Sequence, residues 1–142
     1  MPRLESDSLA GAVSCLVNQL VDNGNVESVE NLVQEVMRRE NEGSTAIGGG
    51  LVIPHARFSG VSEVRIAVAT LADPVALPSE DGRPVDIVIL LVGPEGDPRQ
   101  MLRVLARLAR LVRQEIFLQG LREAETPADL QAAFAEFGGS LA

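Results

Sequence analysis

The sequence predicts a single α/β domain in which helices cover a β-sheet. Apolar residues recur at helical spacing near both ends of the chain, and runs rich in β-branched residues fill its middle. No internal repeat or long linker divides the 142 residues. A domain of this length buries roughly 70% of the surface that its unfolded form exposes, enough for a core without disulfides or metals.

Two helices are predicted in the first 42 residues. Ser6, Asp7 or Ser8 caps the first helix and Gly24 ends it. The apolar residues of this helix are Leu9, Val13, Leu16, Val17, Leu20 and Val21. The second helix begins at about Glu27, and its buried side carries Val29, Leu32, Val33, Val36 and Met37. Arg38 and Arg39 follow at its end, where positive charge complements the helix dipole, and this suffices to explain Arg38.

The middle of the chain is predicted to form strands at residues 45–47, 51–53, 64–71 and 85–92. Gly48, Gly49 and Gly50 separate the first two, where the backbone turns with positive φ or passes close to another group. Pro54 ends the second strand, so His55 is expected where a strand passes into a loop. Residues 81–84 form a turn before the last strand, which reads as buried on both faces.

Two further helices are predicted in the last third of the chain. Asp97, Pro98 and Gln100 are typical of a helix start. They precede one long helix with the apolar residues Met101, Leu102, Leu105, Leu108, Ala109, Val112 and Ile116. Thr126, Pro127 and Asp129 repeat this pattern before a terminal helix. Its inward-facing residues are Leu130, Ala133, Phe134 and Phe137, and residues 138–140 are expected to fray.

Composition argues against several classes of function. With 20 acidic and 12 basic residues, the chain has a net charge of -8, which repels nucleic acid and anionic lipid surfaces. The longest apolar run, residues 87–92, is too short to span a bilayer, and the N-terminus lacks a signal-peptide pattern, so a cytoplasmic location is expected. One cysteine and one histidine leave too few soft ligands for a zinc site, and no metal or cofactor is expected.

His55, the single histidine, is the candidate reactive residue. Imidazole gains and loses its proton near neutral pH, so it serves as nucleophile, base or ligand without an activating partner. The N–H groups of Gly48, Gly49 and Gly50 are candidates for an anion-binding concavity. Arg39 and Arg57 are candidates to neutralise a phosphoryl group, or are simply solvated charges. From the residues alone, a plain binding fold is slightly favoured over histidine-centred phosphoryl or acyl transfer.

The segment from residue 39 to residue 57 nevertheless resembles a known family. Arg39-Glu40, residues 44–48 and above all Gly50-Leu-Val-Ile-Pro-His-Ala-Arg57 are similar to the enzyme IIA domains of the fructose, mannitol and nitrogen-regulatory type. These domains belong to the bacterial phosphoenolpyruvate-dependent phosphotransferase system (PTS). The resemblance extends through residues 74–77, 81–85, 88–94 and 101–109, and we expect the domain to occupy residues 4–138, with 139–142 as a frayed end.

The resemblance implies a mixed β-sheet flanked by helices, in the fold of the phosphotransferase and anion-transport proteins. It implies that His55 receives a phosphoryl group from a small phosphocarrier protein and passes it to an enzyme IIB, or that its phosphorylation controls a regulated protein. The family's arginine falls on Arg39, where it would stabilise the transferring group. The family's second histidine falls on Met101, which cannot donate a hydrogen bond to an anion.

Two functions therefore remain open at this point. The first is a phosphohistidine phosphotransferase in a regulatory, nitrogen-type setting, in which Arg39, Arg57 and Gly48 to Gly50 hold the phosphoryl oxygens. The second is a degenerate regulatory module that binds proteins through the surface around His55 and is not phosphorylated. Met101 favours the second, whereas the intact Pro54-His55 with Arg39 favours the first.

Overall fold

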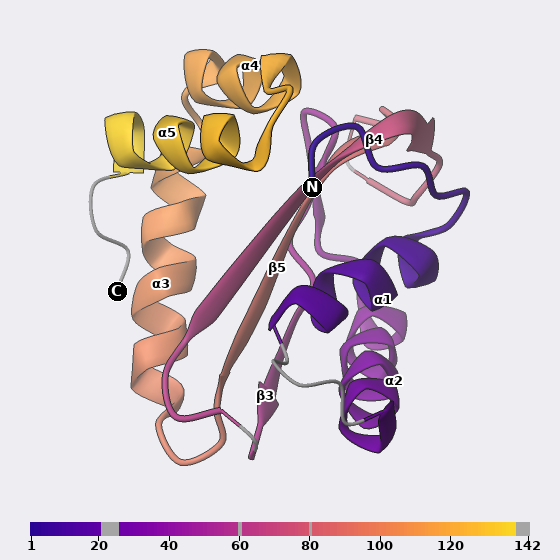
Figure 1. The fold of residues 1–142 in the computed structure, drawn as a ribbon, viewed down its shortest axis with the longest axis vertical. Helices are drawn as coiled ribbons and strands as arrows, with labels where there is room; N and C mark the ends of the chain where they lie inside the picture. The colour runs from indigo at the N-terminus through magenta and orange to yellow at the C-terminus, as the bar shows by residue number, and fades with distance from the viewer. Residues whose placement is uncertain (21–25, 60, 80, 139–142) are drawn as a thin grey trace.

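The computed structural model describes residues 1–20, 26–59, 61–79 and 81–138. Five strands form one sheet: β1 (Ala46–Gly48), β2 (Leu51–Val52), β3 (His55–Phe58), β4 (Arg65–Val75) and β5 (Val85–Pro94). The helices are α1 (Leu9–Leu20), α2 (Val26–Glu42), α3 (Pro98–Leu111), α4 (Glu115–Glu123) and α5 (Pro127–Gly138). The predicted α/β domain is confirmed (Figure 1). The predicted stop at Gly24 and residues 139–142 lie outside the described ranges.

The sheet is built around β5. Strands β2 and β3 pair in parallel with successive parts of one edge of β5, through Leu51 with Ile87 and His55 with Leu91. Strand β4 pairs antiparallel with the other edge, and β1 forms a hairpin with β2. The sheet is therefore mixed, as predicted. Because β2 and β3 follow the same edge, the chain passes from one to the other with only Ile53 and Pro54 between them.

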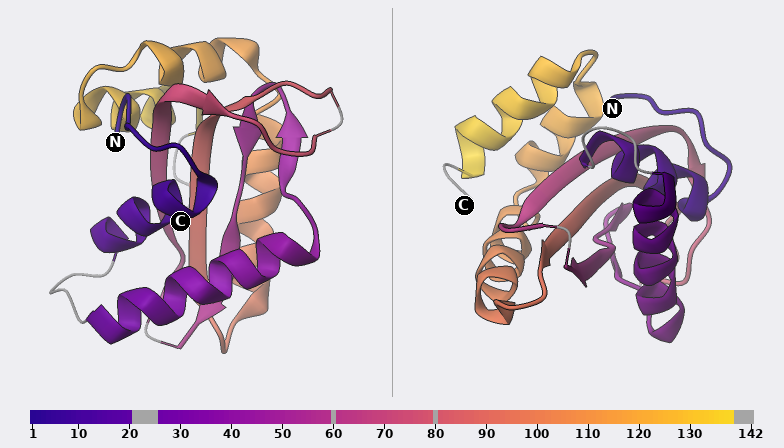
Figure 2. Two further views of the ribbon diagram at one scale, coloured as in Figure 1. Left: turned by 90° about the vertical axis from the view of Figure 1, so that its right-hand side faces the viewer. Right: turned by 60° about the horizontal axis from the view of Figure 1, so that its bottom comes forward.

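Both faces of β5 are buried, which confirms the sequence prediction. Val88, Leu90 and Val92 pack in the core beneath α1 and α2. The alternating residues Ile87, Ile89 and Leu91 pack in a second core beneath α3, α4 and α5. The three views show these two groups of helices on opposite sides of the sheet (Figures 1 and 2). Such a central strand reads as a continuous apolar run rather than an alternating one.

The single long helix predicted through Ile116 is wrong, because the chain forms two helices there. Helix α3 ends at Leu111, the chain turns through residues 112–114, and α4 begins at Glu115. Ile116, expected on the buried side, is 63% exposed. The turn instead directs Phe117 into the core, where its ring meets Phe134 edge-on with centroids 5.1 Å apart. The break therefore improves packing against α5, an interaction that local periodicity does not encode.

The predicted start of α3 is confirmed. The Asp97 carboxylate accepts a hydrogen bond from the backbone N–H of Gln100, and Pro98 is the first helical residue. This cap fixes where α3 begins beside the end of β5. Among the helices in the described ranges, none combines the length and the apolar character needed to cross a lipid bilayer.

Candidate functional site

A cleft of about 620 Å³ runs beside β3, between α2 and α3. His55, Arg39, Arg57 and Met101 all line it, so the structure brings together four of the predicted site residues. The complete lining is Glu35, Arg38, Arg39, Glu42, His55, Ala56, Arg57, Glu95, Pro98, Met101, Leu102 and Leu105. Helix α2 forms a charged wall and α3 an apolar one. Strand β3 pairs with β5 alone among the described strands, which leaves its other edge unpaired beside these helices.

His55 begins a strand, which corrects the expected strand-to-loop exit. Pro54 has no N–H to donate and so interrupts the ladder, but its carbonyl oxygen accepts a bond of 3.0 Å from the N–H of Leu91. The chain thus stays on the edge of β5, and His55 pairs with Leu91 as the first residue of β3. The imidazole is half-buried in the cleft on a strand rather than on a loop.

One hydrogen bond fixes the state of the His55 ring. Its Nδ1 lies 3.0 Å from the carbonyl oxygen of Ile53. A carbonyl oxygen only accepts hydrogen bonds, so Nδ1 must carry the proton in this contact. In the neutral ring, Nε2 is then the nitrogen with a lone pair. Pro54 supports this geometry because a residue before proline is restricted to extended backbone conformations, which limits the directions of the Ile53 carbonyl.

The three arginines of the cleft differ in how they are paired. Arg38 donates to Glu35 at 2.6 Å and to Glu42 at 2.7 Å, and its bond to Glu35 holds the pKa of the Glu35 carboxyl below its ordinary value. Arg39 has one distant contact, 3.8 Å from Nη1 to a carboxylate oxygen of Glu42. The Arg57 side chain makes no ion pair with another residue in the described ranges. Arg39 and Arg57 therefore keep guanidinium donors for an anion, whereas Arg38 is engaged by carboxylates.

Met101 is buried at the base of the apolar wall, with 5% of its surface exposed. It packs over Gly93, where a Cβ would lie 2.7 Å from the Met101 terminal methyl carbon. Its thioether supplies no donor to the cleft. Glu95, Leu102 and Leu105 complete this side of the cleft and were not singled out as site residues. Leu102 was expected in the core but is 65% exposed.

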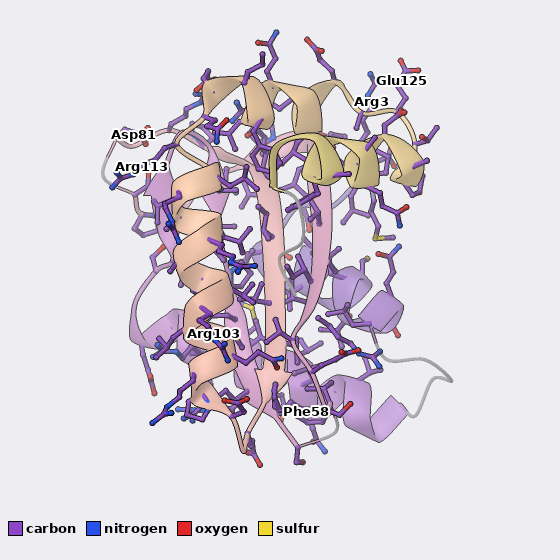
Figure 3. The ribbon with its side chains drawn as sticks, turned by 90° about the vertical axis from the view of Figure 1, so that its left-hand side faces the viewer. Arg3, Phe58, Asp81, Arg103, Arg113 and Glu125 are labelled. Atoms are coloured by element: carbon purple, nitrogen blue, oxygen red, sulfur yellow. The ribbon has the colours of Figure 1, made fainter. Side chains whose placement is uncertain are left out.

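The predicted role of Gly48, Gly49 and Gly50 in holding phosphoryl oxygens is not supported by their position. They form the β1–β2 turn, outside the cleft lining, with positive φ at all three. Leu51 pairs with Ile87 and His55 with Leu91, so about four residues of strand, or about 13 Å, separate the turn from His55. Figure 3 shows Asp81, which accepts a bond from the Gly49 N–H, and Phe58, the last residue of β3, at opposite ends of the molecule.

The glycine turn instead packs against an ion pair. Arg122 on α4 forms two hydrogen bonds with the Asp86 carboxylate, at 2.8 Å and 3.0 Å, and donates another to the Gly49 carbonyl oxygen. A Cβ on Gly50 would lie 2.5 Å from Asp86 Oδ1 and 2.8 Å from Arg122 Nη2. Glycine is therefore required here by close packing and by its φ of +81°. The motif that suggested an anion site has a structural role.

A second cavity, of about 540 Å³, lies among α1, β4 and α5. Its lining is mainly apolar and includes no histidine, cysteine or charged side chain. Transfer of a phosphoryl group to the protein requires a nucleophilic side chain, which this lining lacks, so the cavity does not fit that chemistry. Within the described ranges, no group of three or more histidine, cysteine, aspartate or glutamate side chains is placed to hold a metal ion.

The chain is similar in sequence to known proteins. The family model described as "Phosphoenolpyruvate-dependent sugar phosphotransferase system, EIIA 2" matches residues 3–137. The chain belongs to this family. This confirms the resemblance found from the segment around His55. The EIIA cleft described above therefore carries the Pro-His motif on which that resemblance rests.

Relatives of this EIIA chain include both sugar-specific and regulatory proteins. It is 37% identical over 132 residues to the 2-O-alpha-mannosyl-D-glycerate-specific EIIABC component of Escherichia coli K12. The match includes 91% of this chain but only 20% of the relative, so the chain spans about a fifth of the length of that protein. It is 40% identical over 106 residues to a nitrogen regulatory protein of Bradyrhizobium diazoefficiens, covering 74% of itself and 67% of that protein.

Solved structures show the same fold. The crystal structure of the nitrogen regulatory protein IIA-Ntr from Neisseria meningitidis matches with a TM-score of 0.79 and 26% identity, covering 93% of this chain and 91% of that one. IIA mannitol from Escherichia coli matches with a TM-score of 0.72 and 17% identity, covering 94% and 93%. The latter protein has also been solved in complex with phosphorylated enzyme IIB. At this identity the mannitol structures establish the fold alone.

Proposed function

We propose that this EIIA domain is a phosphocarrier that accepts a phosphoryl group on Nε2 of His55. The observation that carries the proposal is the bond from Nδ1 to the Ile53 carbonyl oxygen, which leaves Nε2 with the lone pair inside a cleft containing Arg39. The donor is the phosphohistidine of a small phosphocarrier protein. As the bond between Nε2 and phosphorus forms, the bond between phosphorus and the donor nitrogen breaks, and the proton on Nδ1 stays in place.

Arg39 and Arg57 are proposed to bind the oxygens of the transferring group. Negative charge spreads over these oxygens during transfer, and guanidinium groups complement it through directed hydrogen bonds. Arg39 is half-exposed and only distantly paired with Glu42, so it turns toward His55 without breaking a short ion pair. Arg57 lies two residues beyond His55 on the same strand, and both residues line the cleft.

We further propose a regulatory, nitrogen-type role in the cytoplasm for a domain spanning residues 4–138. The likeness to the nitrogen regulatory proteins supports this role, because one relative is 40% identical and the IIA-Ntr structure aligns over 91% of its own chain. The phosphoryl group would then pass to an enzyme IIB or alter binding to a regulated protein. The EIIABC relative supports the sugar-transport branch of the same chemistry.

A second candidate is a protein-binding module that is not phosphorylated. It is favoured by Met101, which occupies the position of the family's second histidine, and by the exposed Leu102 on the same wall of the cleft. An apolar wall suits contact with a partner protein whether or not phosphate is transferred. In that case partner binding would not depend on phosphoenolpyruvate.

Intact-protein mass spectrometry separates the two candidates. The chain and its His55→Ala variant are incubated with phosphoenolpyruvate, the general enzyme I and the host's small phosphocarrier. Protein is quantified by amide absorbance because the chain has no tryptophan or tyrosine. The phosphocarrier proposal requires one acid-labile phosphoryl group on the wild type and none on the folded variant. An unchanged mass with the host's own carriers would support the binding module.

A further inference from the structure

A hydrogen-bonded connection links the end of α2 to the β1–β2 hairpin. The Glu40 carboxylate accepts two bonds from one residue, the Thr45 backbone N–H at 2.8 Å and the Thr45 hydroxyl at 2.7 Å. Both Glu40 and Thr45 are half-buried. Bonds to an ionised acceptor are shorter and stronger than neutral ones, and partial burial shields them from competition by water. This pair of bonds closes the corner between α2 and β1.

The same connection continues to the imidazole. The carbonyl oxygen of Thr45 accepts a bond of 3.3 Å from the N–H of Ile53. The carbonyl oxygen of Ile53 in turn accepts the bond of 3.0 Å from Nδ1 of His55. The hydrogen bond to Thr45 orients the Ile53 peptide, and Pro54 restricts the backbone conformation of Ile53. Together these two constraints set the direction of the Ile53 carbonyl oxygen. The path from Glu40 to the reactive ring thus passes through Thr45 and Ile53.

Glu40 is also the residue after Arg39. The helix turn that carries the Arg39 guanidinium into the cleft is therefore held by the same carboxylate that holds Thr45. Fixing α2 to the hairpin at this point fixes Arg39 and His55 relative to each other. Glu40 itself does not line the cleft.

We propose that Glu40 and Thr45 are positioning residues for His55. Their hydrogen bonds hold the Ile53 carbonyl oxygen so that Nδ1 keeps its proton, Nε2 keeps its lone pair, and the ring stays beside Arg39. Neither residue touches the transferring group. The effect on the ring stands on the hydrogen bonds alone, whereas the effect on phosphoryl transfer rests on the function proposed above. A purely structural corner would stabilise the fold but leave the ring unchanged when the fold is intact.

The test uses the fact that the chain has a single histidine, which gives one set of imidazole signals in a ¹H–¹⁵N NMR spectrum. In the wild type at alkaline pH, we expect Nε2 to carry the ¹⁵N signal of an unprotonated nitrogen. Glu40→Ala removes both bonds to Thr45 and should give a mixture of the two tautomers. Glu40→Gln keeps one acceptor oxygen and gains an amide donor for the Thr45 hydroxyl, so it should restore the wild-type spectrum.

The matched control is Glu30→Ala, which removes one exposed negative charge from the same helix, outside the cleft. Its ring signals should equal those of the wild type. If Glu40→Ala does not fold, Thr45→Val removes the hydroxyl bond alone, and Thr45→Ser restores it. Ring signals that stay at their wild-type positions in a folded Glu40→Ala or Thr45→Val variant would overturn the proposal.

The rate of phosphoryl transfer is the second measurement of this test. Small misplacements of reacting groups slow reactions by about 10- to 100-fold, so a loss of this size is expected for Glu40→Ala and recovery for Glu40→Gln. The two proposals fail in different ways. A wild type that is never phosphorylated, with a tautomer change in Glu40→Ala, would reject the phosphocarrier role and retain the positioning role. Normal transfer with unchanged ring signals in Glu40→Ala would reject the positioning role alone.

Discussion

The Met101 side chain occupies the space above Gly93, in which a Cβ would lie 2.7 Å from the Met101 terminal methyl carbon. Gly93 pairs with Arg57, so this contact lies on the strand next to the one that carries His55. Methionine fills the position with an apolar group that has no proton to donate. Because glycine has no side chain, the space above Gly93 can hold a side chain at position 101 that is similar in size to methionine.

Met101→His is therefore expected to speed phosphoryl transfer to His55. The new imidazole would donate a hydrogen bond to the transferring group, and one positioned donor changes a rate by about 10²- to 10³-fold at most. Rapid-quench phosphorylation followed by intact mass measures the rate. Met101→Leu retains the apolar volume without a donor and serves as the control. Equal rates for the two variants would show that position 101 does not contact the transferring group.

Arg39→Ala is expected to slow transfer by about 10²- to 10³-fold, because it removes a cleft guanidinium whose one ion-pair contact, with Glu42, is long and leaves donors for an anion. Arg38→Ala should slow it far less, since Glu35 and Glu42 already occupy the Arg38 guanidinium. Comparing the two variants tests whether the transfer rate depends on the total positive charge of the cleft or on the position of each guanidinium. Similar losses in both variants would indicate that charge alone is responsible.

Gly50→Ala tests the structural role of the glycine turn. Gly82 is its control, because both residues have positive φ, but a Cβ on Gly82 meets no atom within 4 Å. Gly82→Ala should lower the free energy of unfolding by about 1–2 kcal/mol. Gly50→Ala should lower it by about 1–3 kcal/mol more, because it displaces the Arg122–Asp86 pair. Urea denaturation measures both values.

The same Gly50→Ala variant should transfer phosphate at the wild-type rate wherever it is folded. This follows from the distance between the turn and His55. A folded Gly50→Ala variant that transfers phosphate slowly would instead support a role of the glycines in binding the phosphoryl group.

Asp81 should shape the acid dependence of stability. Its carboxylate accepts hydrogen bonds from the N–H groups of Gly49 and Arg83. These bonds, above all the one from Gly49, lower the pKa of Asp81 from the ordinary value of 3.8. The unfolded chain then takes up this proton at higher pH than the folded chain does. The stabilisation is complete above about pH 5, beyond the titration of the unfolded carboxyl, and is lost as the pH falls through the lower folded value.

Asp81→Asn should accordingly show a shallower loss of unfolding free energy between about pH 5 and pH 2 than the wild type. Asp73→Asn, an exposed position on β4, is the control and should follow the wild-type curve. Urea titrations across this range give the comparison. Parallel curves for Asp81→Asn and the wild type would mean that the bonds to Gly49 and Arg83 do not persist in solution.

Sequence patterns predicted most of the fold because the dominant interactions are periodic. The apolar run of β5 and the capped start of α3 are both local features that tertiary packing reinforces. The break between α3 and α4 has no such local feature. Residues 112–114 contain neither glycine nor proline, and the apolar spacing continues through them. Only the packing of Phe117 on Phe134 shows why the chain turns.

The site was predictable in part for a similar reason. Arg39 and His55 were paired by family resemblance, and both line the cleft. The position of the glycines could not be predicted, because composition shows that a backbone can approach a group closely, but not which group. Strand register brings Gly50 to Asp86 and Arg122 rather than to His55, and register is a long-range property. Leu102 was assigned to the core because a helical stripe looks the same whether it faces a core or a cleft.

Strands β3 and β5 differ in the number of their paired edges, and this difference affects how easily each opens locally. Strand β5 is paired on both edges and buried on both faces, so its amide hydrogens should exchange with solvent only when the whole domain unfolds. Among the described strands, β3 pairs only with β5, through a ladder of four residues, and it also packs against α2. We therefore expect the amide hydrogens of β3 to exchange at lower free energy than those of β5. Amide exchange in β3 that leaves the protection of β5 intact would show that His55 can move without unfolding of the core.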